Sequence, residues 1–230
     1  MDATTTLIVA VVCAFVIAFV FSMFGQGGGS VYSPLLLVLS YPILLSTSTS
    51  LVLNLITSLS AGYIFYRRKM IDFKTSFIFA PGISIGAFLG GALSKYFDTT
   101  ILLWLFVLFL AGVGTRMIYG YWEKGKAEEG SLPKLSAAMY ALIALFGLAV
   151  GFIAGLLGVG GGIFIVPFMI YVCKYPTKIA AGSSHLIISF SALAGIIGHA
   201  TSHSFDIPLI VATGIAVLIA GNLGARLSIK

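Results

Sequence analysis

The chain has 230 residues, of which 59% are hydrophobic and 9% are charged. Soluble globular domains carry about 25% charged residues, so this composition excludes a water-soluble domain. The formal net charge of +6 is explained by basic residues that gather in loops on the cytoplasmic side of a membrane, and we expect no nucleic-acid partner.

Seven apolar stretches are candidate transmembrane helices, because each has about 18 residues or more with few charges. In chain order they are 7–24, 47–66, 77–95, 100–119, 136–157, 183–200 and 208–229. Two shorter apolar stretches occupy 31–45 and 163–173. The alternating strands of a transmembrane β-barrel are not visible in the sequence. We therefore expect an all-α, polytopic transmembrane protein.

The chain contains two copies of one unit, which we detect as matching motifs about 134 positions apart. GQGGG (25–29) matches GVGGG (158–162), and in both copies a proline follows five residues after the last glycine. STSTSL (46–51) matches AGSSHL (181–186), and IGAFLGGALSK (85–95) matches IAGNLGARLSI (219–229). We expect a first repeat at 1–120, a cytoplasmic linker at 121–134 and a second repeat at 135–230. The second repeat lacks a counterpart of the span 100–119. Either the chain is truncated, which we favour, or its last helix was lost, or another subunit covers the exposed face.

The distribution of basic residues indicates that the second copy is inverted in the membrane. In the inverted arrangement 12 of the 13 Lys and Arg residues lie on one side, and only Lys95 lies on the other. A parallel arrangement would divide them eight to five. Positive charges concentrate on the cytoplasmic side, so we expect inverted-topology repeats with the amino terminus outside.

The glycine runs predict breaks in two transmembrane helices, each a break or a re-entrant hairpin. Inverted repeats with broken helices are typical of secondary transporters, which bind their substrates near the midplane at the breaks. Exposed N–H groups at the start of a helix attract anions through aligned dipoles. Tight helix packing is the alternative role for glycines, and we favour it for Gly86, Gly90 and Gly91. The predicted cradle consists of Gly27, Gly28, Gly29, Gly160, Gly161 and Gly162.

Polar residues at the start of the following apolar segments are further candidates for substrate binding. Helix capping explains one or two of these hydroxyls in each copy. We expect the others to donate to an oxyanion, with Asn54 adding an amide and Gln26 a polar side chain inside the first break. The predicted hydroxyl donors are Ser48, Thr49, Ser50, Ser183 and Ser184.

Histidines offer two weaker signals. His185 follows Ser184 at the edge of an apolar segment, where it is either a proton-coupling group or a neutral, hydrogen-bonded residue. His199 and His203 are four residues apart in a predicted external loop, and we interpret them as solvated rather than as metal ligands. We expect no metal, no cofactor and no enzymatic activity, because no catalytic cluster is present.

The segment GFIAGLLGVGGGIFIVPFMI (151–170), followed by AAGSSHL (180–186), resembles the signature of the TauE/SafE sulfite exporter family, also called TSUP or the toluene sulfonate uptake permease group. The first copy carries a looser version, FVFSMFGQGGGSVYSPLLLVL (19–39). The resemblance implies transport of sulfite, sulfonates such as sulfoacetate, or other sulfur-containing anions. His185 stands where the family more often has leucine.

The sequence as a whole favours a secondary transporter of small sulfur-containing oxyanions in a prokaryotic inner membrane, working by alternating access. Its expected partners are the anion, the lipid bilayer and, as coupling ion, protons; homo-oligomerisation is left open. The alternatives are an anion channel with the same cradle, a membrane enzyme acting on sulfur compounds and a non-transporting membrane subunit.

Overall fold

A computed structural model gives the fold and describes residues 3–98, 100–102, 104–105, 107–108, 111–112, 115, 133, 135–200 and 205–229. Within these residues every regular element is a helix. Six of the helices are long and apolar enough to cross a bilayer. The prediction of an all-α, polytopic membrane protein is confirmed. Most of the linker 121–134 and much of the span 100–119 lie outside the described residues, and the division into two repeats and a linker stays a prediction.

The structure contains six long and two short helices within the described ranges. The long ones are α1 (Ala3–Met23), α3 (Ile43–Arg67), α4 (Phe73–Leu93), α6 (Ala137–Leu157), α8 (Thr177–Ala200) and α9 (Ile207–Ile229). The short ones, α2 (Gly29–Val38) and α7 (Gly162–Pro167), follow the glycine runs. α7 continues as a π-helix, η2 (Phe168–Val172), and α4 ends in a 3-10 turn, η1 (Ser94–Tyr96).

Local sequence explains where several helices begin. The Asp72 carboxylate caps α4 by accepting from the Lys74 N–H at 3.0 Å, and the Ser136 hydroxyl caps α6 by accepting from the Met139 N–H at 3.3 Å. α3 begins directly after Pro42, four residues before the predicted stretch 47–66. The sequence prediction places the apolar residues just after Pro42 in the short stretch 31–45, because hydropathy alone does not show where one helix ends and the next begins.

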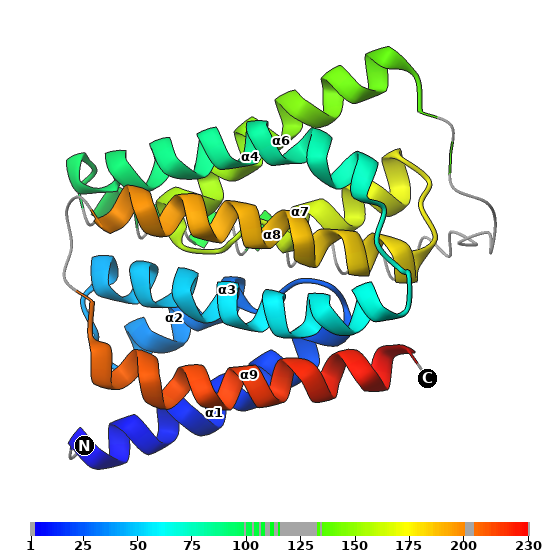
Figure 1. Cartoon of the computed structure of the whole chain (residues 1–230). Helices are drawn as coiled ribbons and strands as arrows, with labels where there is room; N and C mark the ends of the chain where they lie inside the picture. Colours follow the sequence, from blue (N-terminus) through cyan, green and yellow to red (C-terminus); the bar gives the residue numbers. More distant parts are fainter. Residues whose placement is uncertain are drawn as a thin grey trace.

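The helices are arranged around a central pair, α3 and α8, which lie side by side (Figure 1). α9 packs along α3 and carries α1, while α4 packs along α8 and carries α6. The first helix of each copy therefore packs against the last long helix of the other copy. The glycine runs after α1 and α6 are brought into the middle of the protein by this exchange.

Corresponding helices run in opposite directions in Figure 1. α1 and α3 run from the left end of the bundle to the right, whereas α6 and α8 run from right to left. α4 and α9 are likewise opposed. These directions support an inverted repeat, which together with the membrane orientation stays a prediction.

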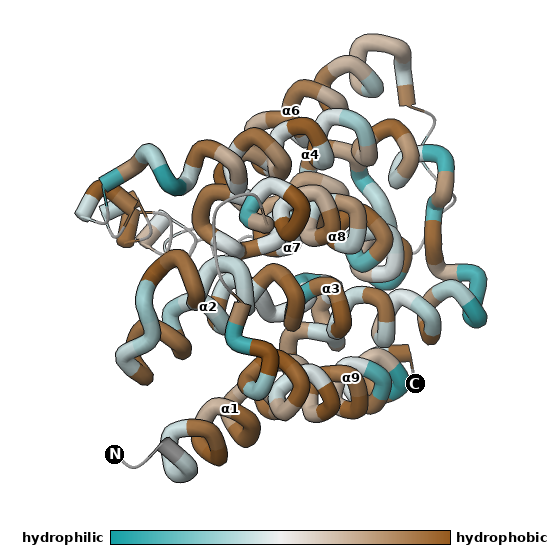
Figure 2. Tube along the Cα trace, turned by 60° about the vertical axis from the view of Figure 1, so that its left-hand side comes forward, coloured by the Kyte–Doolittle hydropathy of each residue, from teal (hydrophilic) through white to brown (hydrophobic). Residues whose placement is uncertain are grey.

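The outer surface is apolar along the length of the helices. Figure 2 shows hydrophobic residues along the spans and hydrophilic ones mainly at their ends. On α1, the side chains of Ile8, Val12 and Val16 are 58%, 57% and 55% exposed and lie four residues apart on one face. A stripe of this kind is stable against lipid but not against water.

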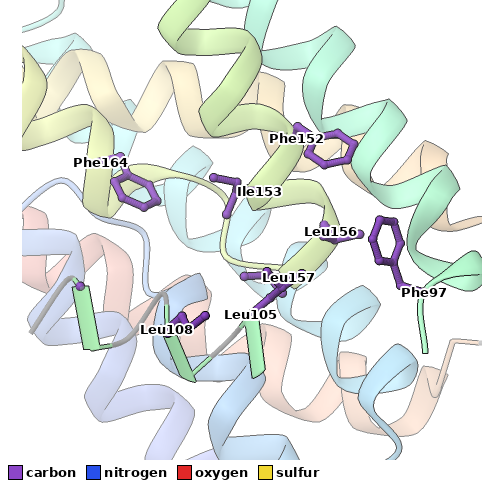
Figure 3. Close-up of a pocket in the computed structure, with 9 residues that line it drawn as sticks. Phe97, Leu105, Leu108, Phe152, Ile153, Leu156, Leu157 and Phe164 are labelled. Atoms are coloured by element: carbon purple, nitrogen blue, oxygen red, sulfur yellow. The ribbon is translucent and has the colours of Figure 1, made fainter. Parts of the chain in front are cut away.

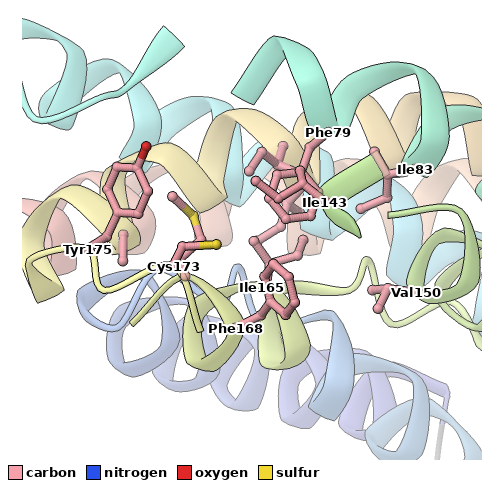
Figure 4. Packing of buried hydrophobic residues seen from close by; sticks show 12 residues of the cluster. Phe79, Ile83, Ile143, Val150, Ile165, Phe168, Cys173 and Tyr175 are labelled. Atoms are coloured by element: carbon pink, nitrogen blue, oxygen red, sulfur yellow. The ribbon is translucent and has the colours of Figure 1, made fainter. Parts of the chain in front are cut away.

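Figure 4 shows the hydrophobic cluster that holds the second glycine run in place. Phe79 and Ile83 of α4 meet Ile143 of α6, Ile165 of α7 and Phe168 of η2 there. Phe168 also stacks on Phe146 with ring centroids 4.0 Å apart. The short helix α7 is thereby anchored to α4 and α6 although it is too short to cross the bilayer.

Glycines let α4 and α6 approach closely, as small residues do at transmembrane helix interfaces. A methyl group placed on Gly86 would lie 2.2 Å from the Leu148 carbonyl oxygen, and one on Gly151 would lie 2.3 Å from the Ile83 carbonyl oxygen. Both contacts are with main chain, which cannot move aside without separating the helices. Gly86 therefore has the packing role favoured for it from the sequence.

We expect Gly86→Ala to lower the melting temperature of the purified protein by several degrees, because α4 must move away from α6. The matched control is Gly62→Ala on α3, where the new methyl meets only the Cβ of His185 at 3.4 Å. In a helix, alanine at this control position should be neutral or slightly stabilising. Equal melting temperatures for the two variants, measured in the same detergent, would contradict the close packing.

Candidate functional site

Both glycine runs interrupt helices with the same backbone geometry. In the first break Gly25, Gly27 and Gly28 have φ angles of 76°, 74° and 101°. In the second break the residues 133 positions later, Gly158, Gly160 and Gly161, have φ angles of 73°, 73° and 80°. Positive φ is costly for residues with a side chain, so glycine is required at these positions. The predicted breaks are confirmed.

The two breaks touch each other through their main chains. A methyl group on Gly29 would lie 2.4 Å from the Val159 carbonyl oxygen, and one on Gly162 would lie 2.6 Å from the Gln26 carbonyl oxygen. The first residue of each short helix therefore faces the middle of the opposite break. This reciprocal contact places the starts of α2 and α7 at one location.

Each break is held by a serine from the central helix of the other copy. The Ser50 hydroxyl of α3 lies 2.8 Å from the Gly158 carbonyl oxygen and 3.1 Å from that of Gly29. The Ser184 hydroxyl of α8 donates to the carbonyl oxygen of Gly25 or of Ala181. Both predicted donors therefore bond to break carbonyls in this structure, which satisfies acceptors that the interrupted helices leave open.

Asn54 lies between the two breaks. Its Nδ2 donates to the Val159 carbonyl oxygen at 3.3 Å. A methyl on Gly27 would lie 2.1 Å from its Oδ1, and a methyl on Gly160 would lie 1.6 Å from its Nδ2. Its Oδ1 is buried without a hydrogen-bond partner among the described residues. Like Ser50, Asn54 therefore lies against glycines of both breaks, and its amide is close to Gly27 of the first and Gly160 of the second.

The other predicted hydroxyls are distributed differently. They lie in the second turns of α3 and α8 rather than at the helix starts, so they do not act as N-caps. Ser48 donates to the Leu44 carbonyl oxygen of its own helix at 2.9 Å. Ser183 accepts a hydrogen bond from the Asp72 N–H at 2.8 Å, away from the breaks. The Thr49 hydroxyl is buried and, within the described ranges, has no partner.

Gln26 and His185 border the first break. The Gln26 residue is partly exposed, and its carbonyl oxygen faces Gly162. The His185 ring is fully buried, its Nε2 lies 3.1 Å from the Ser22 carbonyl oxygen, and it packs against Phe65 with centroids 5.5 Å apart. In the Nε2–H tautomer the ring donates to this carbonyl, so it holds the last turn of α1.

Sequence reasoning missed Ser58, which lies one turn after Asn54 on the same face of α3. A methyl on Gly27 would be 2.8 Å from the Ser58 hydroxyl, and this hydroxyl has no partner in the described part of the chain. Ser30 and Ser33 of α2 carry similarly unpartnered buried hydroxyls. Buried polar atoms are usually hydrogen-bonded, so these hydroxyls are further candidates for contact with a polar ligand. The sequence signal that could have found Ser58 is its spacing of four residues from Asn54, which places both side chains on one face of a helix.

The short helices begin without side-chain caps. Neither Gly28 before α2 nor Gly161 before α7 can supply one, and the described structure has no capping hydrogen bond at either start. The leading N–H groups of a helix have no acceptor within the helix itself. Two sets of N–H dipoles therefore meet beside Asn54, and an anion is the ligand that such helix starts attract.

An apolar cavity lies near the second break but does not suit an anion. It measures about 380 Å³ and is lined by apolar residues of α6 and α7 and of the segment after η1 (Figure 3). Phe152, Leu156 and Phe164 are among them. An anion placed there would lose its water without gaining hydrogen bonds.

The glycine breaks themselves are closed in this conformation, because a methyl group placed on Gly29 or Gly162 would collide with the main chain of the opposite break.

The expectation that His199 is solvated was wrong. His199 lies in α8, is fully buried, and its Nε2 is 2.9 Å from the Gly155 carbonyl oxygen of α6. Helix α8 extends to Ala200 and packs on α4, so this histidine faces protein rather than water. His203 lies outside the described residues. The residues that the structure describes contain no cluster of metal-binding side chains.

Known proteins resemble this chain over nearly its whole length. The chain matches the family model described as sulfite exporter TauE/SafE over residues 10–230. It belongs to the TauE/SafE family. No solved structure matches the chain significantly.

Relatives of this TauE/SafE protein are named as transporters. The probable membrane transporter protein YunE of Bacillus subtilis is 28% identical over 242 residues, which cover 97% of this chain and 89% of the relative. A probable membrane transporter protein of Xylella fastidiosa is 30% identical over 235 residues, covering 98% and 86%. One of Methanocaldococcus jannaschii is 26% identical over 238 residues, covering 96% and 85%. Family and relatives identify the chain as a multi-pass membrane transporter.

Proposed function

We propose that this TauE/SafE protein is a secondary transporter of small sulfur-containing oxyanions, such as sulfite or an organosulfonate like sulfoacetate. The observation that carries the proposal is the meeting of two uncapped helix starts beside Asn54. A sulfite or sulfonate group presents three oxygen atoms, and each can accept hydrogen bonds from main-chain N–H groups and from side-chain donors. The description of the matched family, sulfite exporter, supports this choice of cargo.

Binding by dipoles and neutral donors suits a carrier, because the site must also release its cargo. The described residues place no Lys or Arg among the atoms nearest to the break glycines. A Lys or Arg side chain at the site would bind the anion more tightly, and tighter binding slows its release. In our proposal the breaks open by small movements of α2 and α7 around Ser50, Ser184 and Asn54, and the anion enters between them.

The proposed transport cycle is alternating access of the two copies about the central helices α3 and α8. The opposed helix directions and the exchange of α1 and α6 between the copies support it. Protons are the proposed coupling ion, with His185 beside the first break as the titratable group. We place the protein in the inner membrane of a prokaryotic cell, since relatives come from bacteria and an archaeon.

Counterflow in proteoliposomes tests this function. Vesicles that contain the purified protein and unlabelled sulfite, sulfoacetate or thiosulfate should accumulate the same radiolabelled anion from a dilute outside solution, with saturable kinetics. Control vesicles without protein should not. Linear, non-saturating flux with single-channel currents would favour the anion channel, and no flux of any of these anions would favour a non-transporting subunit.

A further inference from the structure

Two pairs of residues occur at matching positions in the two copies, outside the glycine breaks. Tyr41-Pro42 precedes α3 and Tyr175-Pro176 precedes α8, 134 positions later. Asp72 precedes α4 and Asp206 precedes α9, again 134 positions apart. In Figure 1 the turn before α4 and the start of α8 lie at the right end of the bundle, and the starts of α3 and α9 lie at the left end.

At the right end the pair is joined. The Tyr175 hydroxyl donates to Asp72 Oδ2 and accepts from the Thr75 hydroxyl at 2.6 Å. The Asp72 N–H donates to the Ser183 hydroxyl of α8 at 2.8 Å, while Oδ1 of the same residue caps α4. Asp72 thus ties the start of α4 to the start of α8 through its main chain and its carboxylate. Burial first, and the bond to Asp72 second, raise the pKa of Tyr175.

At the left end the matching pair is not joined. Asp206 caps α9 by accepting from the Leu209 N–H at 3.0 Å, as Asp72 caps α4. Among the described residues the Tyr41 hydroxyl has no hydrogen bond, and the same is true of the buried hydroxyl of Thr49, which lies 134 positions before Ser183. The two residues are nonetheless near each other, because Tyr41 packs against the cluster that contains Leu209, the residue whose N–H Asp206 caps. Burial first, and the charge of Asp206 second, raise the pKa of Tyr41.

We propose that Tyr175–Asp72 and Tyr41–Asp206 are two alternating gates at opposite ends of the bundle. The right gate is closed in this structure, and the left gate closes when the right one opens. The role in a transport cycle rests on the proposed function, whereas the opposed closure of the two ends does not. Because the tyrosine and the aspartate occur in both copies, the chain contains the gate twice. In this structure the Tyr175–Asp72 pair is joined and the Tyr41–Asp206 pair is not.

Cys173 provides a reporter for the right gate. It is 1% exposed and lies two residues before Tyr175, and Figure 4 shows the two side chains close together. Burial raises the pKa of this thiol to about 11, so it reacts slowly while the gate is closed. Opening of the gate should expose it to a small, water-soluble thiol reagent.

The test measures the labelling rate of Cys173 in a Cys13→Ala background, in proteoliposomes. Tyr175→Phe removes the hydroxyl and should raise the rate by about fivefold or more, because a charge-assisted hydrogen bond is lost from the closed state. Tyr41→Phe weakens the opposite state and should lower the rate or leave it at the parent value. Asp72→Asn keeps an oxygen that can cap α4 but weakens the bond to Tyr175, so it should raise the rate as Tyr175→Phe does. It serves as the second variant if Tyr175→Phe does not fold.

The sign of the effect separates a gate from a merely structural contact. Equal increases for Tyr175→Phe and Tyr41→Phe would mean general loosening and would overturn the proposal, as would an unchanged rate in all three variants. The labelling needs no cargo. A rate raised by Tyr175→Phe but not by Tyr41→Phe, without anion counterflow, would therefore retain the gates and reject the proposed function. Counterflow without this difference between the two variants would do the reverse.

Discussion

Replacing Asn54 by leucine is expected to reduce anion uptake at least about tenfold while leaving the protein folded, because the loss of a hydrogen bond to a charged ligand costs about 1.5–3 kcal/mol. Leucine branches at the same atom as asparagine and can occupy the same space between Gly27 and Gly160. The structural loss is the 3.3 Å bond to the Val159 carbonyl oxygen, a contact worth about 1 kcal/mol. The measurement is the initial rate of radiolabelled sulfite or sulfoacetate uptake into proteoliposomes.

Two comparisons sharpen this experiment. Ser191→Ala removes another buried hydroxyl that has no partner in the described structure, but Ser191 is not among the atoms nearest to any break glycine. Its uptake rate should equal that of the parent. Asn54→Asp has nearly the same shape and adds a negative charge that repels the anion, so it should also reduce uptake. Asn54→Leu uptake within twofold of the parent would remove Asn54 from the binding site.

Gly160→Ala is expected to lower the stability of the protein markedly. Its φ of 73° costs a residue with a side chain about 1–2 kcal/mol, and the new methyl would lie 1.6 Å from Asn54 Nδ2. A total cost of about 3 kcal/mol would lower the melting temperature by roughly 6–12 °C for a chain of this size. Thermal unfolding of the detergent-solubilised variant, followed by intrinsic fluorescence, checks the shift.

A second substitution separates the two causes of the lost stability, which are the positive φ of residue 160 and the collision with Asn54. Asn54→Ala in the Gly160→Ala protein removes the collision but not the unfavourable φ, so it should restore only part of the lost melting temperature. Gly62→Ala again serves as the control, because Gly62 is helical and its new methyl meets only an ordinary contact. If Gly160→Ala melts like Gly62→Ala, the second break does not have the geometry described here.

Local sequence features predicted much of the fold. Long apolar stretches gave the spans because a helix that satisfies its own main-chain groups is the stable form of such a stretch in lipid. The glycine runs predicted the breaks, since only glycine adopts positive φ without strain. The start of α3 at Ile43 was missed because hydropathy carries no boundary information. The burial of His199 was missed because it depends on α8 packing on α4, and hydropathy does not show which face of a helix meets another helix.

The candidate site was predictable only in outline. The sequence indicated that Ser50, Ser184 and Asn54 lie near the breaks, but not that Ser50 bonds to the second break and Ser184 to the first. It also did not distinguish Ser58, which faces Gly27, from the other hydroxyls of α3. These assignments depend on pairings between residues more than 100 positions apart in the chain.

The sequence by itself therefore determined the membrane environment, the helical class and the two breaks, and it predicted a duplication. Each follows from hydropathy or from the backbone freedom of glycine, which are properties of short segments. The tertiary structure alone decided that the two breaks meet, that each is held by the opposite copy and that Asn54 lies between them. Those features arise because α1 and α6 pack against the other copy's last helix, and no short-range pattern encodes which of several similar apolar faces will pair.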